Sequence, residues 1–236
     1  MVSILTTKKI ISLGALTIRI LQNHYFKNII RNHESEGVDF WWIDWQQHLT
    51  SNDTYGLSET FWCNHIFFND MVRKRTDRRP VIFHRWGGLG SHRYQIGFSG
   101  DALINFQTLG FQPYFTATAS NVGYGYWGHD LGGHAFTDES IVNDPELVLR
   151  WIQFGVFTPI FRTHATNDAR IERRIWKFDN FPTMLEAVRL RYSLFPYLYT
   201  MARKAYDTGI SVCRPLYYEY PESEEAYVYE NEYFFR

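Results

Sequence analysis

The stretch Val38–Asp44, VDFWWID, is an apolar run that ends in a carboxylate. A strand that is covered on both faces has a run of this kind, and such strands are typical of parallel sheets. We therefore expect a buried parallel strand here, with Asp44 at its carboxyl end. The fold class then depends on whether the rest of the chain supplies partner strands and the helices that connect parallel strands.

Four further short runs along the chain have a similar pattern. The predicted strands are Pro80–Arg85, Tyr94–Phe98, Gly123–Trp127 and Pro159–Arg162. Segments with helical patterns separate these runs. Strand, loop and helix repeated in this way indicate an α/β fold with a parallel sheet.

Helix signals lie between the predicted strands. Ser58 can cap a helix, and Asp144–Glu146 combines a capping residue with a proline and an acid in the first turn. Further helices are expected over Ala102–Leu109 and over Pro182–Tyr206, and the second of these should stop near Gly209. These helices are the expected crossover connections of the sheet.

Polar residues stand at the ends of nearly all predicted strands: Asp44, Arg85, Asp101, Asp130 and His164. A (β/α)8 barrel collects its active site at the carboxyl ends of its strands, whereas a doubly wound sheet uses one switch point. The wide distribution of these residues favours the barrel. Since the chain supplies only about five strand–helix units, we expect an incomplete (β/α)8 TIM barrel, approximately strands 4 to 8.

We expect three segments along the chain. Residues 1–23 stay unassigned, residues 24–209 form a partial (β/α)8 catalytic domain, and residues 210–236 begin a C-terminal β-domain. An incomplete barrel leaves open strand edges. We therefore expect this chain by itself to fold poorly and to have little activity.

The composition limits the class of partner. The chain has 236 residues, a net charge of −1 and no basic stripe, so no nucleic acid partner is expected. No apolar run is long enough for a membrane span, so no membrane partner is expected either. The aromatic share of 18% fits sugar-stacking surfaces, but it fits aromatic-rich packing equally well.

Two aspartates have the residue types and positions that glycosidic bond cleavage needs. That reaction uses one acid to protonate the leaving oxygen and one carboxylate to meet the sugar carbon. Asp44, between Trp42 and Trp45, is the candidate nucleophile, and Asp101, which follows Gly100, is the candidate general acid/base. An Asp at a strand end is also a common helix N-cap, and for Asp101 the two interpretations are evenly balanced.

Three other strand-end residues have candidate roles in the same site. Asp130 and His164 could hold sugar hydroxyls, and Arg85 could orient a carboxylate. A histidine such as His164 is more often a structural hydrogen-bonding residue. Asp130 with His129 and His134 hints at a metal site, but this spacing in a glycine-rich loop is a weak signal, so neither a metal nor another cofactor is expected.

Taken together, the motifs are more specific than any one of them. In chain order they are VDFWWIDWQQ (38–47), RWGGLGSHRYQIGFSGD (85–101), NVGYGYWGHDLGGH (121–134), PIFRTHAT (159–166) and LRYSLFPYLYTMARKAYDTG (190–209). This order resembles glycoside hydrolase family 31, the α-glucosidase and α-xylosidase family, over roughly residues 25–236. The resemblance implies a (β/α)8 barrel and a retaining mechanism on α-glycosides.

The resemblance also implies roles for individual residues. Asp44 falls on the nucleophile position and Asp101 on the acid/base position. The remaining matched residues line the subsite that holds the cleaved sugar, with two aromatic residues as its walls: Arg85, Asp130, His164, and the walls Trp42 and Phe161.

The sequence departs from the family pattern after the nucleophile. The commonest α-glucosidase pattern there is Asp-Met-Asn-Glu, whereas Asp44 is followed by Trp45, Gln46 and Gln47. Glucose specificity is therefore open, and xylosides, galactosides, N-acetylgalactosaminides or transglycosylation are alternatives. Residues 1–23 do not resemble the barrel segment that precedes this region in the family.

The function that we expect is that of a retaining α-glycoside hydrolase acting on terminal α-linked sugars, with a carbohydrate as its partner. A carbohydrate-binding remnant that has lost turnover is the first alternative, and a non-carbohydrate structural fragment is the second. The presence of both Asp44 and Asp101 favours the enzyme. The sequence assigns neither a compartment nor a protein partner.

Overall fold

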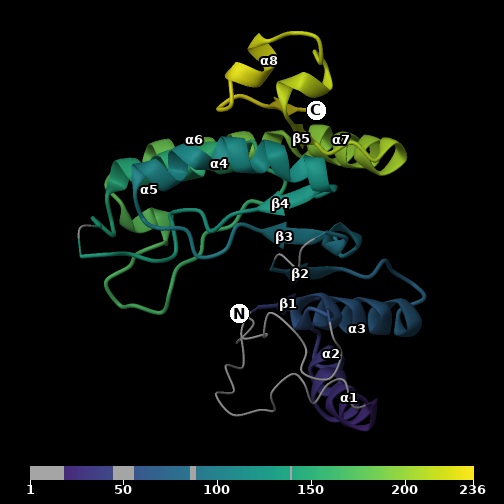
Figure 1. Ribbon diagram of the computed structural model, residues 1–236. Helices are drawn as coiled ribbons and strands as arrows, with labels where there is room; N and C mark the ends of the chain where they lie inside the picture. The colour runs from purple at the N-terminus through teal and green to yellow at the C-terminus, as the bar shows by residue number, and fades with distance from the viewer. Residues whose placement is uncertain (1–18, 45–55, 86–88, 139) are drawn as a thin grey trace. The chain divides into compact units, whose positions relative to one another are not determined.

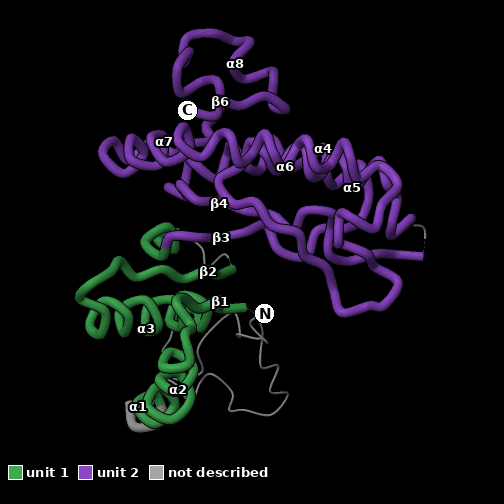
Figure 2. The backbone as a smooth tube through the Cα atoms, turned by 180° about the vertical axis from the view of Figure 1, so that it is seen from behind, with its two compact units in different colours: residues 1–94 green, residues 95–236 purple. Residues whose placement is uncertain are grey.

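The computed structural model describes residues 19–44, 56–85, 89–138 and 140–236. The chain divides into two compact units, Met1–Tyr94 and Gln95–Arg236, which Figure 2 shows in different colours. Each unit contains a pair of parallel strands joined through a helix. This strand–helix–strand arrangement is the repeating element of α/β folds.

The first unit is built around the predicted strand over Val38–Asp44. Strands β1 (Trp41–Ile43) and β2 (Ile82–His84) pair in parallel, with Ile43 opposite His84. Both predicted strands are confirmed and are shorter than expected. The helical and turn elements of this unit are α1 (Arg19–Tyr25), a π-helical turn (Phe26–Ile30), α2 (Arg31–Ser35), α3 (Glu59–Lys74) and a 3-10 turn (Ser91–Arg93).

Helix α3 begins where the sequence predicts. The Ser58 side chain accepts a hydrogen bond from the Phe61 amide at 3.4 Å. This amide is one of those in the first turn that have no carbonyl partner within the helix. One face of α3 is apolar and buried, and it packs against β1, β2 and the helical turns before them. This hydrophobic cluster contains Phe26, Ile30, Ile43, Cys63, Ile66, Phe67, Met71, Ile82 and Tyr94.

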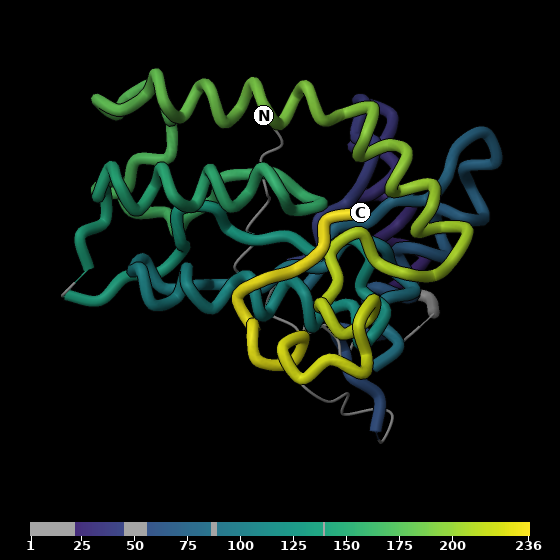
Figure 3. Tube along the Cα trace, turned by 90° about the horizontal axis from the view of Figure 1, so that it is seen from above, coloured from purple at the N-terminus to yellow at the C-terminus, as the bar shows by residue number. Residues whose placement is uncertain are grey.

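The second unit repeats the pattern with β3 (Ile96–Phe98) and β4 (Tyr126–Gly128), which pair in parallel through Ile96 and Tyr126. Both were predicted. Figure 1 shows the order of its other elements, and Figure 3 shows α5 lying alongside α6, which leads into α7. These elements are α4 (Phe106–Ala119), α5 (Pro145–Val156), α6 (Phe181–Ser193), α7 (Phe195–Thr208), β5 (Cys213–Arg214), α8 (Glu225–Val228) and β6 (Phe234–Phe235), with 3-10 turns at Ser120–Val122, Ile175–Lys177 and Leu216–Tyr218.

The predicted helix over Ala102–Leu109 is wrong at its start. Helix α4 begins at Phe106, after Asn105 accepts a hydrogen bond from the Thr108 amide at 2.7 Å. The residues before it form a loop instead, because the Ile104 amide donates to the Ala135 carbonyl at 2.8 Å. This long-range pairing replaces the local helical bond that the sequence pattern suggested.

The predicted fifth strand, Pro159–Arg162, is also wrong. In its place the structure has an isolated parallel bridge between Leu131 and Thr163. The buried guanidinium of Arg191 donates to the carbonyls of Val156, Thr158 and Pro159 at 2.5–2.9 Å. Within the predicted strand, the Pro159 carbonyl is therefore paired with a side chain, whereas the Arg162 carbonyl accepts from the Leu131 amide at 3.2 Å beside the bridge.

The long predicted helix over Pro182–Tyr206 is two helices, α6 and α7, which meet at Leu194. Pro196 lies just after this junction, and a proline has no amide to donate and clashes with the carbonyl four residues earlier. The predicted stop is confirmed, since Gly209 adopts a left-handed conformation with φ +73° at the end of α7.

The predicted start of α5 is confirmed. The Asp144 carboxylate accepts hydrogen bonds from the amides of Glu146 and Leu147 at 2.9 and 3.4 Å. Helix α5 then buries Leu147 and Trp151 in a hydrophobic cluster beneath the loops that follow β3 and β4. The full set of buried members is Ile104, Leu109, Leu131, Leu147 and Trp151.

The last part of the chain forms an antiparallel pair. Strand β5 pairs with β6, with Cys213 opposite Phe235. This change from parallel to antiparallel pairing is what a β-domain beginning at residue 210 would show, although the predicted domain boundaries stay a proposal. Within the described ranges, no helix has both the length and the apolar character that crossing a bilayer requires.

Candidate active site

Asp44 and Arg85 occupy matching positions in the first unit. Because β1 and β2 are parallel with Ile43 opposite His84, the residues that follow these two strands leave the sheet at the same edge. Arg85 Nε donates to Asp44 Oδ1 at 2.6 Å. The Arg85 side chain is 9% exposed and the Asp44 side chain 26% exposed, so the pair is largely shielded and the carboxylate keeps access to solvent. A hydrogen bond of this kind between a guanidinium and a carboxylate fixes the orientation of the Asp44 side chain.

His84 supports the end of β2 from within the unit. Its ring is fully buried, with one nitrogen at the Arg85 carbonyl, the other at the Tyr94 carbonyl, and Asn64 Nδ2 3.0 Å from Nδ1. Burial lowers the pKa of His84 below its ordinary value, and the hydrogen bonds to the two carbonyls act in the opposite direction. A neutral His84 donates from one ring nitrogen only, and with Nδ1 accepting from Asn64 the donor is Nε2, which bonds to the Tyr94 carbonyl. Nδ1 lies against the Arg85 carbonyl, so His84 packs directly on the backbone that carries Arg85.

Asp101 follows β3 in the second unit. Gly100 before it has φ +82°, and the Asp101 side chain is 43% exposed. Asp101 does not cap helix α4, because Asn105 does so four residues later. The capping interpretation is therefore excluded for this helix. Asp101 Oδ2 lies 3.8 Å from Nε2 of His134, a residue that the sequence interpretation did not place in the site.

Asp130 follows β4 and is completely buried. Its Oδ1 accepts from Arg162 at 2.5 Å, and its Oδ2 lies 3.5 Å from Nδ1 of His134. The turn between Asp130 and His134 reverses the chain: the Gly133 amide donates to the Asp130 carbonyl at 2.9 Å, and Gly132 and Gly133 both have positive φ. These glycines bring His134 back onto the carboxylate four residues earlier.

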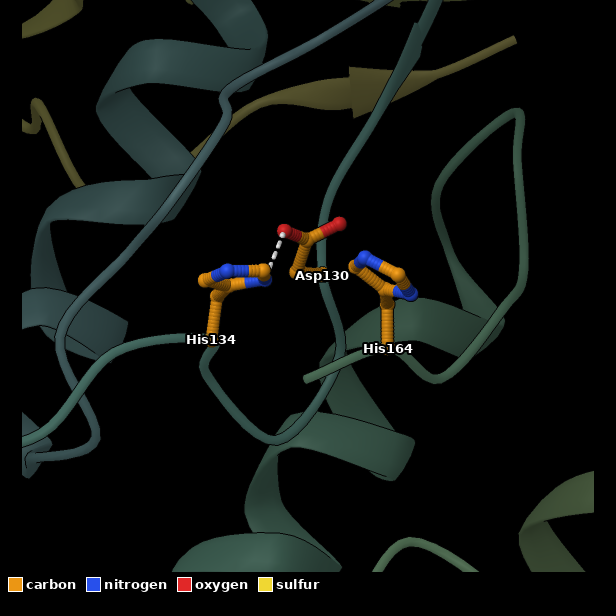
Figure 4. Close-up of side chains that lie close together, drawn as sticks. All are labelled: Asp130, His134 and His164. Carbon is orange, nitrogen blue, oxygen red and sulfur yellow. Dashed lines mark ion pairs between the residues drawn. The ribbon is translucent and has the colours of Figure 1, made fainter. Parts of the chain in front are cut away.

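His164 completes a cluster with these two residues. Its ring lies 5.1 Å from the His134 ring, centroid to centroid, and Figure 4 shows the Asp130 carboxylate between the two imidazoles. One donor atom from each of the three side chains lies within 4.8 Å of the others. The sequence signal for His134 is its spacing from Asp130 across two glycines, which by itself is a weak indication.

His129 does not join this cluster. Its Nε2 lies 2.6 Å from the Thr116 hydroxyl and its Nδ1 lies 2.9 Å from the Ser99 hydroxyl. Complete burial lowers the pKa of His129 to about 3, with the Asp130 charge raising it and the Arg162 charge lowering it further. His129 is thus a neutral hydrogen-bonding residue of the interior, and His164 takes the place beside Asp130 and His134.

The two candidate wall residues lie in different units. Trp42 is on β1 and half-buried, with its ring 5.2 Å from the ring of Phe83. Phe161 is half-buried, packs against the cluster around Trp151, and has the Arg191 guanidinium 5.8 Å from its ring centre. The strand-end residues therefore fall into two groups, Asp44 with Arg85 in the first unit and Asp101, Asp130 and His164 in the second. Trp45, Gln46 and Gln47 lie outside the described residues.

Curated relatives share a large part of the chain. A probable glucan 1,3-α-glucosidase of Oryza sativa is 35% identical over 185 residues, which are 77% of this chain and 19% of that protein. An α-glucosidase 2 of Bacillus thermoamyloliquefaciens is 30% identical over 197 residues, 83% of this chain and 23% of that protein. The chain spans about a fifth of the length of these curated relatives.

Solved structures share its fold. A family 31 sulfoquinovosidase from E. rectale superposes with a TM-score of 0.76 and 27% identity, covering 96% of this chain and 36% of that chain. A family 31 α-xylosidase from a soil metagenome, solved with xylose, gives a TM-score of 0.76 and 25% identity, covering 93% of this chain and 37% of that chain. The α/β class and the parallel strands that the sequence predicted are therefore confirmed.

The family model of the glycosyl hydrolases family 31 TIM-barrel domain matches residues 20–201, which is most of the chain. This match contains every strand-end residue described above, and it agrees with the resemblance found in the motifs. The chain belongs to glycosyl hydrolase family 31, within its TIM-barrel domain.

Proposed function

We propose that the protein that contains this chain is a retaining α-glycoside hydrolase, with Asp44 as nucleophile and Asp101 as general acid/base. The observation that carries the proposal is the partly buried contact between Arg85 Nε and Asp44 Oδ1 at 2.6 Å. It supplies a charged, oriented carboxylate at the end of a parallel strand, where TIM barrels collect their catalytic residues. Family membership supports the same assignment.

The proposed reaction has two steps. An Asp44 oxygen forms a bond to the anomeric carbon while the glycosidic C–O bond breaks, and Asp101 gives its proton to the leaving oxygen. Asp101, now a carboxylate, then takes a proton from water as the water oxygen attacks the same carbon and releases Asp44. Two displacements at one carbon retain its configuration.

The proposed roles divide between the two carboxylates according to their surroundings. The Arg85 guanidinium holds the Asp44 carboxylate in one orientation, which suits a nucleophile that must meet the anomeric carbon in line. Asp101 is more exposed and lies 3.8 Å from an imidazole nitrogen of His134, so a leaving oxygen or a water molecule can reach it. On this assignment the two carboxyl groups should approach each other at roughly 5–5.5 Å, the separation typical of retaining enzymes.

Three further side chains are proposed to hold the hydroxyls of the cleaved sugar: Arg85, Asp130 and His164. Asp130 supports this best, since it is completely buried and its Oδ2 accepts no hydrogen bond within the described ranges. A buried acceptor of this kind needs a donor, and a sugar hydroxyl is one. Trp42 and Phe161 are proposed as the apolar walls of the same subsite.

The substrate is proposed only as a class of sugar. The relatives carry the names α-glucosidase, α-xylosidase and sulfoquinovosidase, so a terminal α-glucoside or an α-glycoside of similar size is the proposed substrate. The residues after Asp44 differ from the commonest α-glucosidase pattern, which keeps xylosides, galactosides, N-acetylgalactosaminides and transfer to another sugar as alternatives.

Variants of the full-length protein test the two roles. Asp44→Ala should abolish turnover of every α-glycoside, whereas Asp101→Ala should slow substrates with poor leaving groups far more than activated aryl α-glycosides, which need little protonation. Azide, which needs no general base, should restore part of the Asp101→Ala activity on an activated substrate. Equal losses on both substrate types would contradict the role of Asp101, and sugar binding without any turnover would favour a carbohydrate-binding remnant.

A further inference from the structure

The cluster of Asp130, His134 and His164 has the chemistry of a metal site. Two imidazole nitrogens and one carboxylate oxygen form a common donor set for zinc and similar divalent cations, and three protein ligands leave a coordination position open. All three side chains belong to the second unit and point at one another in Figure 4. The glycine turn between Asp130 and His134 fixes two of the three donors.

The distances fit this chemistry. Two donors that share a tetrahedral Zn2+ at about 2.0–2.1 Å lie roughly 3.4 Å apart. The separation between His134 Nδ1 and Asp130 Oδ2 is 3.5 Å, too long for a good hydrogen bond and close to this value. All three donor atoms lie within 4.8 Å of one another.

A second observation points to a ligand. Asp130 is 0% exposed, and its Oδ2 atom accepts no hydrogen bond from any residue that the structure describes. Arg162 pairs with Oδ1, but burial of Oδ2 without a hydrogen bond is still costly, because the lost hydration of that oxygen is not replaced. A cation bound between Asp130 and the two histidines removes that cost.

The groups around the cluster are placed as supports of a metal site. Arg162 donates to the other oxygen of Asp130, which fixes the carboxylate with Oδ2 turned toward the imidazoles. When Nδ1 of His134 faces Asp130, its Nε2 faces Asp101 Oδ2 at 3.8 Å. A carboxylate behind a metal-binding histidine is the usual outer partner of such a ligand.

We propose that Asp130, His134 and His164 bind a zinc-like divalent cation and that the bound cation excludes the sugar. The exclusion of the sugar rests on the proposed function, because Asp130 and His164 are also the proposed hydroxyl-binding residues. The cation site itself is independent of that function. The cation is an inhibitor here and takes no part in the reaction. Arg162 lowers the affinity through charge repulsion, so the site is weaker than a closed structural zinc site.

Cobalt and zinc test the site directly. The full-length protein, dialysed against chelator, should bind one Co2+ with the visible absorption of a low-symmetry tetrahedral or five-coordinate site, and Zn2+ should displace it. His134→Gln and His164→Gln should each weaken Zn2+ binding by more than about a hundredfold, the upper end of the loss seen on removing an outer partner. Asp101→Asn should weaken it by about 10- to 100-fold.

Controls separate this inference from the proposed function. His92→Gln removes an exposed histidine of the first unit and should leave Zn2+ affinity unchanged, and circular dichroism checks that every variant is folded. With an aryl α-glucoside, Zn2+ should raise KM and leave kcat unchanged. Absent Co2+ and Zn2+ binding, or binding that survives both histidine variants, overturns the cation site. Binding without any glycosidase activity would leave the site standing and contradict the proposed function instead.

Discussion

At the scale of single residues, Arg85 is the side chain on which the proposed nucleophile depends. It is buried at the end of β2 and donates to Asp44 at 2.6 Å. We predict that Arg85→Ala lowers kcat/KM on aryl α-glycosides by about a hundredfold or more, because a carboxylate misplaced by about 1 Å can cost that much. Steady-state kinetics on the full-length protein measures this.

Two variants control for charge. Arg85→Lys keeps a positive charge but loses the planar group, and it should restore only part of the activity. Arg78→Ala breaks an exposed pair with Asp39 on the same unit and should leave kcat/KM nearly unchanged. Wild-type rates in Arg85→Ala would show that Asp44 needs no such partner.

His84 makes the stability of the first unit depend on pH. Its folded pKa lies below the ordinary value of 6.5, so the unfolded chain binds the proton more readily. Stability is therefore fully present above about pH 6.5 and falls as the pH drops, by at most about 1.4 kcal/mol per pH unit from this one group.

Urea unfolding at pH 7 and pH 5 measures the effect. His84→Gln should be less stable than wild type at pH 7, because buried hydrogen bonds are lost, but it should lose less stability between pH 7 and pH 5. An equal loss in both proteins would show that other groups account for the acid sensitivity.

At the scale of elements, the turn after β4 determines where His134 lies. Gly133 has φ +80°, and a Cβ there would lie 2.9 Å from Cα of Ile104. We predict that Gly133→Ala destabilises the protein by roughly 1–3 kcal/mol through backbone strain, and that it weakens Zn2+ binding by displacing His134. Gly125→Ala, at a glycine with nothing within 4 Å of the added Cβ, is the matched control and should stay within about 0.5 kcal/mol of wild type.

The elements also show where sequence patterns succeed. Caps at Ser58 and Asp144 and the stop at Gly209 depend on neighbouring residues only, and all three were predicted. The start of α4 and the segment over Pro159–Arg162 depend on partners far along the chain, Ala135 and Arg191, which no local pattern reveals. For the same reason the sequence indicated His134 only weakly, since its neighbours Asp101 and His164 are distant in sequence.

At the scale of the whole molecule, the two cysteines report on the two units separately. Cys63 is in the first unit and Cys213 in the second, and both are buried and free. Burial raises the pKa of Cys63 to about 12 from 9.0, which leaves roughly a thousandfold less reactive thiolate near pH 8. Burial raises the pKa of Cys213 as well.

We predict that neither thiol reacts measurably with iodoacetamide in the native protein and that each reacts when its own unit unfolds. Pulse labelling along a urea gradient, followed by peptide mapping, would show whether the two units unfold at the same urea concentration. Reaction of either cysteine at the rate of an unfolded chain in buffer would contradict the burial of that unit's core.

Much of the fold could be predicted from the sequence, because the apolar runs indicate the strands and the family motifs indicate their order. The strand ends that bear Asp44, Arg85, Asp101 and Asp130 were all predicted, and the parallel pairing of β1 with β2 and of β3 with β4 was expected. The cluster around His134 was only hinted at, with His129 in place of His164, because its geometry comes from a glycine turn and from rings that meet across the loops.

The central claim is that Asp44 forms the covalent intermediate, and trapping that intermediate tests it most directly. A 5-fluoro-α-glycosyl fluoride should inactivate the full-length protein with time, and peptide mass spectrometry should find one sugar attached at Asp44. Asp44→Asn should show no attachment, whereas Asp101→Ala should still be labelled, because fluoride leaves without an acid. Attachment at any other residue, or product of inverted configuration from the natural substrate, would contradict the account.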